Sequence, residues 1–69
     1  MKKSAREWMS QIPASAQRRG RDEWVTASCP ICGWEVDVTV RPSDAGARAA
    51  ARERVLRHIR QSHPEEIAD

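Results

Sequence analysis

The sequence predicts a small α+β domain in which a β-hairpin packs on one long C-terminal helix, a ββα arrangement, with a short N-terminal helix and a basic linker before it. Two patterns predict this fold class. Residues 34–40 alternate apolar and polar side chains with a period of two, as a strand with one buried face does. Residues 44–62 repeat apolar side chains every three or four positions, as an amphipathic helix does.

The length and composition of the chain limit the core that it can form. A chain of 69 residues allows one domain, which is marginally stable unless a cross-link or bound group reinforces it. Hydrophobic residues make up 39% of the chain, with three Trp and neither Phe nor Tyr, so the core must be thin. No apolar run follows the basic start at residues 1–3, so neither a signal peptide nor a membrane span is expected. We therefore expect a cytoplasmic protein with reduced thiols and no membrane partner.

Positive charge is concentrated at the N-terminal end. Residues 1–21 hold six Lys or Arg against one Glu, a net charge of +5, whereas residues 22–69 hold six Arg against nine Asp or Glu, a net charge of −3. Arg outnumbers Lys ten to two, which suits bidentate contacts to phosphate. A GC-rich genome would produce the same bias without a functional cause, and both explanations stay open.

The N-terminal arm, residues 1–21, is predicted to contain one short helix. Ser4 and Glu7 match a capping box, and Pro13 ends the helix, which gives bounds of 4–12. Its apolar face is formed by Ala5, Trp8, Met9 and Ile12. Two turns are unstable alone, so this face either packs on the rest of the chain or awaits a partner. Residues 14–21, small and basic with Gly20, are interpreted as a linker, which leaves 22–69 as the single domain.

The domain begins with the hairpin. Residues 24–28 and 34–40 are rich in β-formers, and the five residues between them allow only a tight turn, in which Gly33 can take positive φ. Ser43 is the predicted N-cap of a helix from Asp44 to Ser62. One stripe of this helix should face the hairpin: Ala47, Ala51, Val55, His58, Ile59 and Ser62. The opposite side carries polar residues: Glu53, Arg54, Arg57, Arg60 and Gln61.

Four potential metal ligands occur in two pairs. Cys29 and Cys32 lie on the hairpin turn, and His58 and His63 lie at the end of the helix. This spacing fits a tetrahedral zinc site. Five residues rotate a position by about 140° on a regular helix, so the helix end must distort for both imidazoles to converge. The following Pro64 favours that distortion, because it disfavours α geometry in the residue before it.

These residues resemble the Cys2His2 zinc-finger family, over roughly residues 22–66. The resemblance rests on the segments Cys-Pro-Ile-Cys-Gly at 29–33 and His-Ile-Arg-Gln-Ser-His-Pro at 58–64. It implies a ββα fold with zinc buried between hairpin and helix. The chain departs from the family pattern because 25 residues separate Cys32 from His58, where the common finger has about a dozen. A longer helix of roughly 28 Å and a longer strand of roughly 23 Å can absorb the excess together.

Two other interpretations of the four residues remain. The cysteines and histidines can be incidental, with one His near the helix C-terminus, or Cys29 and Cys32 can form a disulfide, which in this motif is often redox-active. Zinc is the favoured interpretation. Two thiolates and two imidazoles would leave no open coordination position, so we expect neither an enzyme nor a small-molecule substrate.

The sequence supports two kinds of partner. DNA or RNA is the first, contacted by Arg18, Arg19 and Arg21 of the arm and by Arg54, Arg57 and Arg60 of the helix. The base-reading positions of the family are not carried over, because residues 44–47 offer almost no hydrogen-bonding side chains. The alternative is a protein-interaction module or a structural subunit of a larger assembly, with Trp8, Met9 and Ile12 as anchors. Trp24 and Trp34 either join that surface or pack on the domain.

Overall fold

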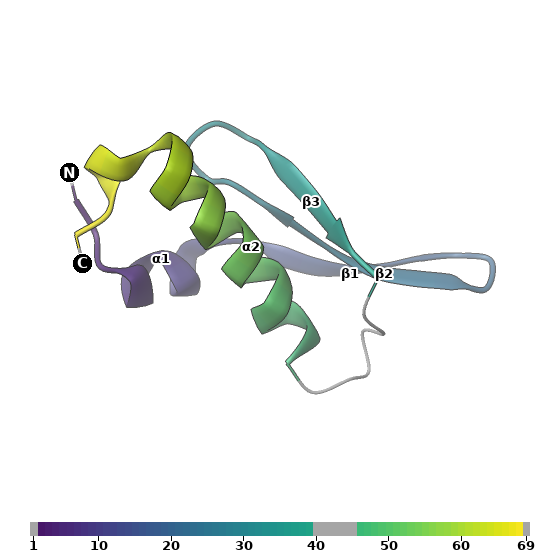
Figure 1. Ribbon diagram of the computed structural model, residues 1–69. Coiled ribbons are helices and arrows are strands. Elements are labelled where there is room, and N and C mark those ends of the chain that lie inside the picture. The colour runs from purple at the N-terminus through teal and green to yellow at the C-terminus, as the bar shows by residue number, and fades with distance from the viewer. Residues whose placement is uncertain (1, 40–45, 69) are drawn as a thin grey trace.

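The computed structural model describes residues 2–39 and 46–68. Its elements are α1 (Ala5–Gln11), β1 (Ala14–Arg19), β2 (Asp22–Ser28), β3 (Glu35–Val38), α2 (Ala47–Ser62) and the 3-10 turn η1 (Pro64–Glu66). The strands form one antiparallel sheet of order β1-β2-β3. Helix α2 packs on all three strands, and α1 packs against α2 (Figure 1). The predicted α+β class is confirmed.

The linker interpretation of residues 14–21 is wrong, because most of this segment is strand β1. It pairs with β2 over its whole length, from Ala14 opposite Ala27 to Arg19 opposite Asp22. Gly20 takes a φ of +61° in the two-residue connection, the positive φ that tight hairpin loops require. Nearly all of β1 is exposed, so its side chains show no core periodicity. Hydrogen bonding to β2 makes it a strand, and the residue pattern did not reveal that pairing.

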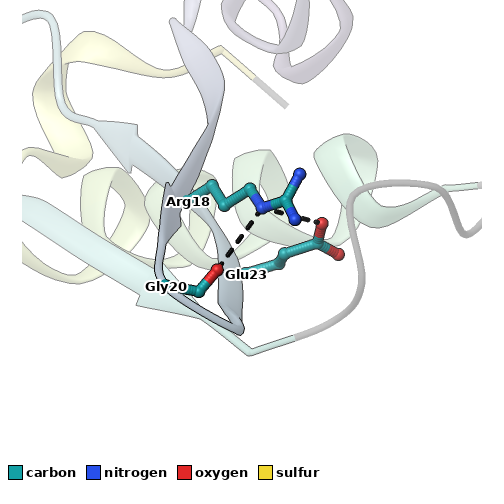
Figure 2. Close-up of polar contacts among 3 residues, drawn as sticks. All are labelled: Arg18, Gly20 and Glu23. Carbon is teal, nitrogen blue, oxygen red and sulfur yellow. Dashed lines mark hydrogen bonds and ion pairs between the residues drawn. The ribbon is translucent and has the colours of Figure 1, made fainter.

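The β1–β2 turn projects beyond α2 (Figure 1). Figure 2 shows the Arg18 guanidinium beside the Gly20 carbonyl, which it reaches at 3.5 Å, and the Glu23 carboxylate, at 4.0 Å. Arg18 and Glu23 are direct cross-strand partners. Both side chains are exposed, so this pair contributes little to stability.

Helix α1 forms as the capping motif predicts and packs on the rest of the chain. The Glu7 amide donates to Ser4 Oγ at 3.2 Å, and the helix ends at Ile12, which is extended before Pro13. Trp8 and Ile12 are 5% and 1% exposed. Their face is therefore part of the core, so this helix packs on the rest of the chain and does not await a partner.

Polar contacts fasten the N-terminal segment to the C-terminal one. The Trp8 indole donates to the Glu66 carbonyl at 2.8 Å, and the Arg52 guanidinium donates to the Ile12 carbonyl at 3.0 Å. Lys3 and Ile67 form a parallel bridge, so the two ends of the described chain lie side by side (Figure 1). These contacts make α1 a structural part of the domain.

Helix α2 presents the predicted apolar stripe to the sheet. Ala47, Ala51, Val55 and Ile59 are buried, and the polar side predicted for the helix is exposed. The structure adds Leu56 to the core and leaves Ser62, the last helical residue, exposed. The helix begins at Ala47, after Gly46 as N-cap, and therefore later than predicted. The predicted cap Ser43, together with Asp44 and Val40, lies outside the described residues.

Both hairpin strands form where the sequence places them, with shifted ends. β2 begins at Asp22, two residues before the predicted start, and β3 ends at Val38 within the described residues. Alternate side chains of β2 are buried, because Val25 and Ala27 face α2. On the opposite face the Trp24 indole donates to Thr26 Oγ1 at 3.1 Å. Within the described part of the chain, every helix lacks the length and apolar character needed to cross a membrane.

A conservative substitution tests whether the N-terminal segment belongs to the core. Ile12→Val should lower the free energy of unfolding by about 0.5–1.5 kcal/mol, because Ile12 is fully packed. Ile31→Val removes the same methylene from a side chain that is 37% exposed and should stay within about 0.5 kcal/mol. Urea unfolding of both variants under the same conditions measures the two changes. Equal effects of the two substitutions would contradict the packing described for α1.

Candidate metal centre

The turn between β2 and β3 places two thiols on the same end of the sheet. The Cys29 amide donates to the Trp34 carbonyl at 2.6 Å, and the Gly33 amide donates to the Cys29 carbonyl at 2.9 Å. Gly33 has a φ of +80°, as this tight turn requires. Cys29 is buried and Cys32 exposed, and both are free thiols, so the disulfide is not formed. The tight turn predicted between the strands is confirmed.

The end of α2 supplies the two imidazoles. His58 lies on the helix and is half-buried. His63 follows the last helical residue with φ −133° and ψ 54°, outside the α region, and its amide still donates to the Ile59 carbonyl at 2.7 Å. Pro64 then starts the 3-10 turn. The distortion that the sequence predicts at this helix end is therefore present.

The four side chains converge on one point. Their ligand atoms all lie within 4.8 Å of one another. Cys32 Sγ is 3.3 Å from His58 Nε2, and the two imidazole rings meet edge to face with centroids 5.3 Å apart. A tetrahedral site with ordinary metal–sulfur and metal–nitrogen bonds separates its ligand atoms by about 3.3–3.8 Å. The set therefore needs only a small contraction to bind one ion.

One atom of this cluster lacks a hydrogen-bond partner. Within the described residues, the buried nitrogen Nε2 of His63 makes no hydrogen bond. An unpaired buried polar atom is costly, and native folds almost always satisfy it. A metal ion among the four ligands would accept the lone pair of this nitrogen. The chemistry of the donor set and the orphaned atom thus both fit a bound metal.

The residues around the Cys32 thiol favour its deprotonated form, which is the form that binds metals. The His63 imidazole lowers the pKa of this thiol to about 6, with further contributions from His58, the Trp34 backbone and Cys29. Because the thiolate, not the thiol, binds metals, a low pKa reduces the proton competition at neutral pH.

Trp34 belongs to the site although the sequence reasoning did not place it there. Its indole stacks on the His58 ring, with centroids 4.3 Å apart and planes 10° from parallel. The stacking fixes the orientation of His58 from the side of the hairpin. Trp34 nevertheless remains 41% exposed. Its position directly after the Cys-x2-Cys-Gly turn was the only available signal, and it did not indicate which histidine lies beside the ring.

The remaining predicted site residues lie on three elements. Arg18 and Arg19 end β1, and Arg21 follows in its turn, whereas Arg54, Arg57 and Arg60 are exposed on α2.

The predicted protein anchors need correction. Trp8 and Ile12 are in the core, and Met9 packs against it half-buried, so this face is not available to a partner. The physical reason is that the short helix gains more from packing on α2 than from exposing an apolar face.

Comparison with protein-family models, curated proteins and solved structures produced no match for this chain. The fold and the site alone define its class. It is a small α+β domain in which a β-hairpin turn and a helix end bring together two cysteines and two histidines able to bind a metal ion. This ββα-like arrangement is compatible with a zinc site.

Metal titration tests the four-ligand cluster directly. The chain should bind one Co²⁺ ion, and His63→Ala should weaken its binding by more than about 100-fold. Loss of a residue that only hydrogen-bonds to a metal ligand already lowers metal affinity by about 10- to 100-fold, and His63 is itself a proposed ligand. Gln61→Ala, at an exposed position two residues away, should bind like the unmodified chain. Competition with a chromophoric chelator measures all three affinities. Unchanged affinity after His63→Ala would rule out the cluster as a four-ligand site.

Proposed function

We propose that the ion is zinc and that its role is structural. Paired thiolate and imidazole ligands are the donors that zinc prefers in tetrahedral sites. Four protein ligands fill such a site, so no position remains for a substrate or a reactive water. Catalysis at the metal is therefore not part of the proposal.

The small core supports a structural role for the ion. Among the described residues, eleven hydrophobic side chains are buried, and four of them are alanine or cysteine. A domain of this size commonly needs a metal or disulfide. Structural zinc in small zinc-finger peptides contributes about 10–16 kcal/mol of apparent binding free energy, which becomes folding free energy. Here it would join the β2–β3 turn to the far end of α2.

The metal identity can be measured on the purified protein. Protein from cells grown without added metal should contain one zinc ion per chain by mass spectrometry with elemental analysis. A strong chelator should abolish the cooperative thermal transition, because the core alone is too small. Zinc should restore the transition, and Mg²⁺, which prefers oxygen ligands, should not. A chain that keeps its transition without metal would contradict the structural role.

We further propose that the domain acts by binding nucleic acid. The observation that supports this proposal is the set of exposed guanidinium groups without partners. Arg19 and Arg21 at the β1–β2 turn have no ion pair or hydrogen bond within the described residues, and the same holds for Arg54 and Arg57 on α2. Unpaired exposed arginines on a projecting turn and on a helix face suit a phosphate backbone.

The contacts in this proposal go mainly to phosphates. The first residues of α2, Ala47 to Ala50, offer one hydrogen-bonding side chain, Arg48. A helix that starts in this way has little to present to base edges in a major groove. We therefore expect weak sequence preference in duplex DNA.

A protein partner remains the second candidate. Within the described residues, Ile31 and Trp34 are the large hydrophobic side chains that stay exposed, at 37% and 41%, and both lie at the metal-site turn. Exposed apolar side chains on a rigid turn are suitable anchors for a protein interface. This surface replaces the one that the sequence predicted on α1.

A salt series separates the two candidates. Binding to random duplex DNA should weaken steeply with salt, and replacing Arg18, Arg19 and Arg21 with Ala should reduce the log–log slope by up to about 3, since each phosphate contact contributes nearly one unit. Arg6→Ala, at an exposed position of α1 and at the opposite end of the molecule from the β1–β2 turn, is the control and should leave the slope unchanged (Figure 1). Binding that does not respond to salt, or no binding at low salt, would refute the proposal.

A further inference from the structure

A groove of about 650 Å³ lies between β3 and α2, beside the metal site. Its hairpin side is formed by Trp34, directly before β3, and by Val36 of β3. Its α2 side includes Arg54, Arg57 and the candidate ligand His58. The volume falls in the range of small-ligand sites. The groove therefore combines an aromatic ring, a short apolar wall and two guanidinium groups.

Trp34 is the one tryptophan that the fold does not enclose. Trp8 is buried, and its indole N–H donates to the Glu66 carbonyl. Trp24 is half-buried, and its indole N–H donates to Thr26 Oγ1. The Trp34 ring has one face against His58, yet 41% of the residue is exposed, and its indole N–H has no partner among the described residues. An exposed indole held rigid by stacking is a ready platform for another flat ring.

The groove also carries net positive charge. Arg54 and Arg57 are three residues apart on one side of α2, and neither has a partner within the described chain. Glu53 is the one carboxylate in the lining. Two guanidinium groups thus line the groove with one carboxylate, which favours an anionic ligand.

We infer that this groove binds single-stranded nucleic acid, with a base stacked on Trp34 and the adjoining phosphates contacted by Arg54 and Arg57. The inference deepens the proposed nucleic-acid function and rests on it. A flat base and a negative phosphate match the two features that the groove places together, the indole and the guanidinium groups. Bases in a duplex are stacked on one another, so their flat faces are not accessible to Trp34. The groove therefore distinguishes single strands from duplexes.

The stacking component can be isolated with two probes. One is a fluorescent oligothymidylate of about ten nucleotides, and the other is an abasic oligomer of equal length, which keeps the phosphates and lacks the bases. The zinc-loaded full chain should bind the first about 5- to 150-fold more tightly, the range expected for stacking one base. Trp34→Leu should remove this preference, and Trp34→Phe should restore part of it.

Matched variants separate stacking from charge and from folding. Ile31→Ala removes the other exposed apolar side chain of the same turn and should keep the preference for bases. Replacing Arg54 and Arg57 with Ala should weaken binding of both oligomers equally. Zinc content and circular dichroism of each variant show whether the fold is retained, and the Trp34→Phe result keeps the test decisive if Trp34→Leu loses metal.

Each outcome has a distinct meaning. Equal affinity for the two oligomers, or a base preference that survives Trp34→Leu, would overturn the groove proposal, while salt-dependent duplex binding would preserve the broader nucleic-acid function. No binding to any nucleic acid at low salt would overturn both. If instead a peptide of alternating Asp and Phe binds and Trp34→Leu abolishes that binding, the groove is a peptide site and the inference is wrong.

Discussion

The contact between the β2–β3 turn and the C-terminal end of α2 is the constraint on which the domain depends. Cys32 Sγ lies 3.3 Å from His58 Nε2, and Trp34 stacks on the same imidazole, so both contacts hold this end of α2 against the turn. The apolar stripe of α2 is mostly alanine and valine, which permits close approach but supplies limited buried area.

The N-terminal segment adds a third strand to the sheet and two large side chains to the core. The β2–β3 hairpin and α2 alone would leave β2 unpaired on its outer side and one side of α2 uncovered. Strand β1 pairs with β2, and α1 contributes Trp8 and Ile12, two of the largest buried side chains. Half of the positive residues in 1–21 are therefore carried by a folded strand and its turn, which gives Arg18, Arg19 and Arg21 a defined position relative to the sheet.

The sequence could predict those features that local patterns encode. The capping residues of α1, the alternation in β3, the apolar stripe of α2 and the spacing within each pair of ligands need only residues close together in the sequence. Strand β1 could not be found in this way, because its side chains are small or polar and its conformation depends on pairing with β2. The environment of Trp34 depends likewise on a partner 24 residues away, His58, which local patterns do not identify.

The parallel bridge between Lys3 and Ile67 has a consequence for the dynamics of the chain. The Lys3 amide donates to the Glu66 carbonyl at 3.0 Å, and the Ala68 amide donates to the Lys3 carbonyl at 2.9 Å. Segments near chain ends usually unfold independently of one another and at little cost in free energy. Here, opening one end exposes the hydrogen-bonding groups of the other, so the two should exchange their amide hydrogens as a single cooperative unit.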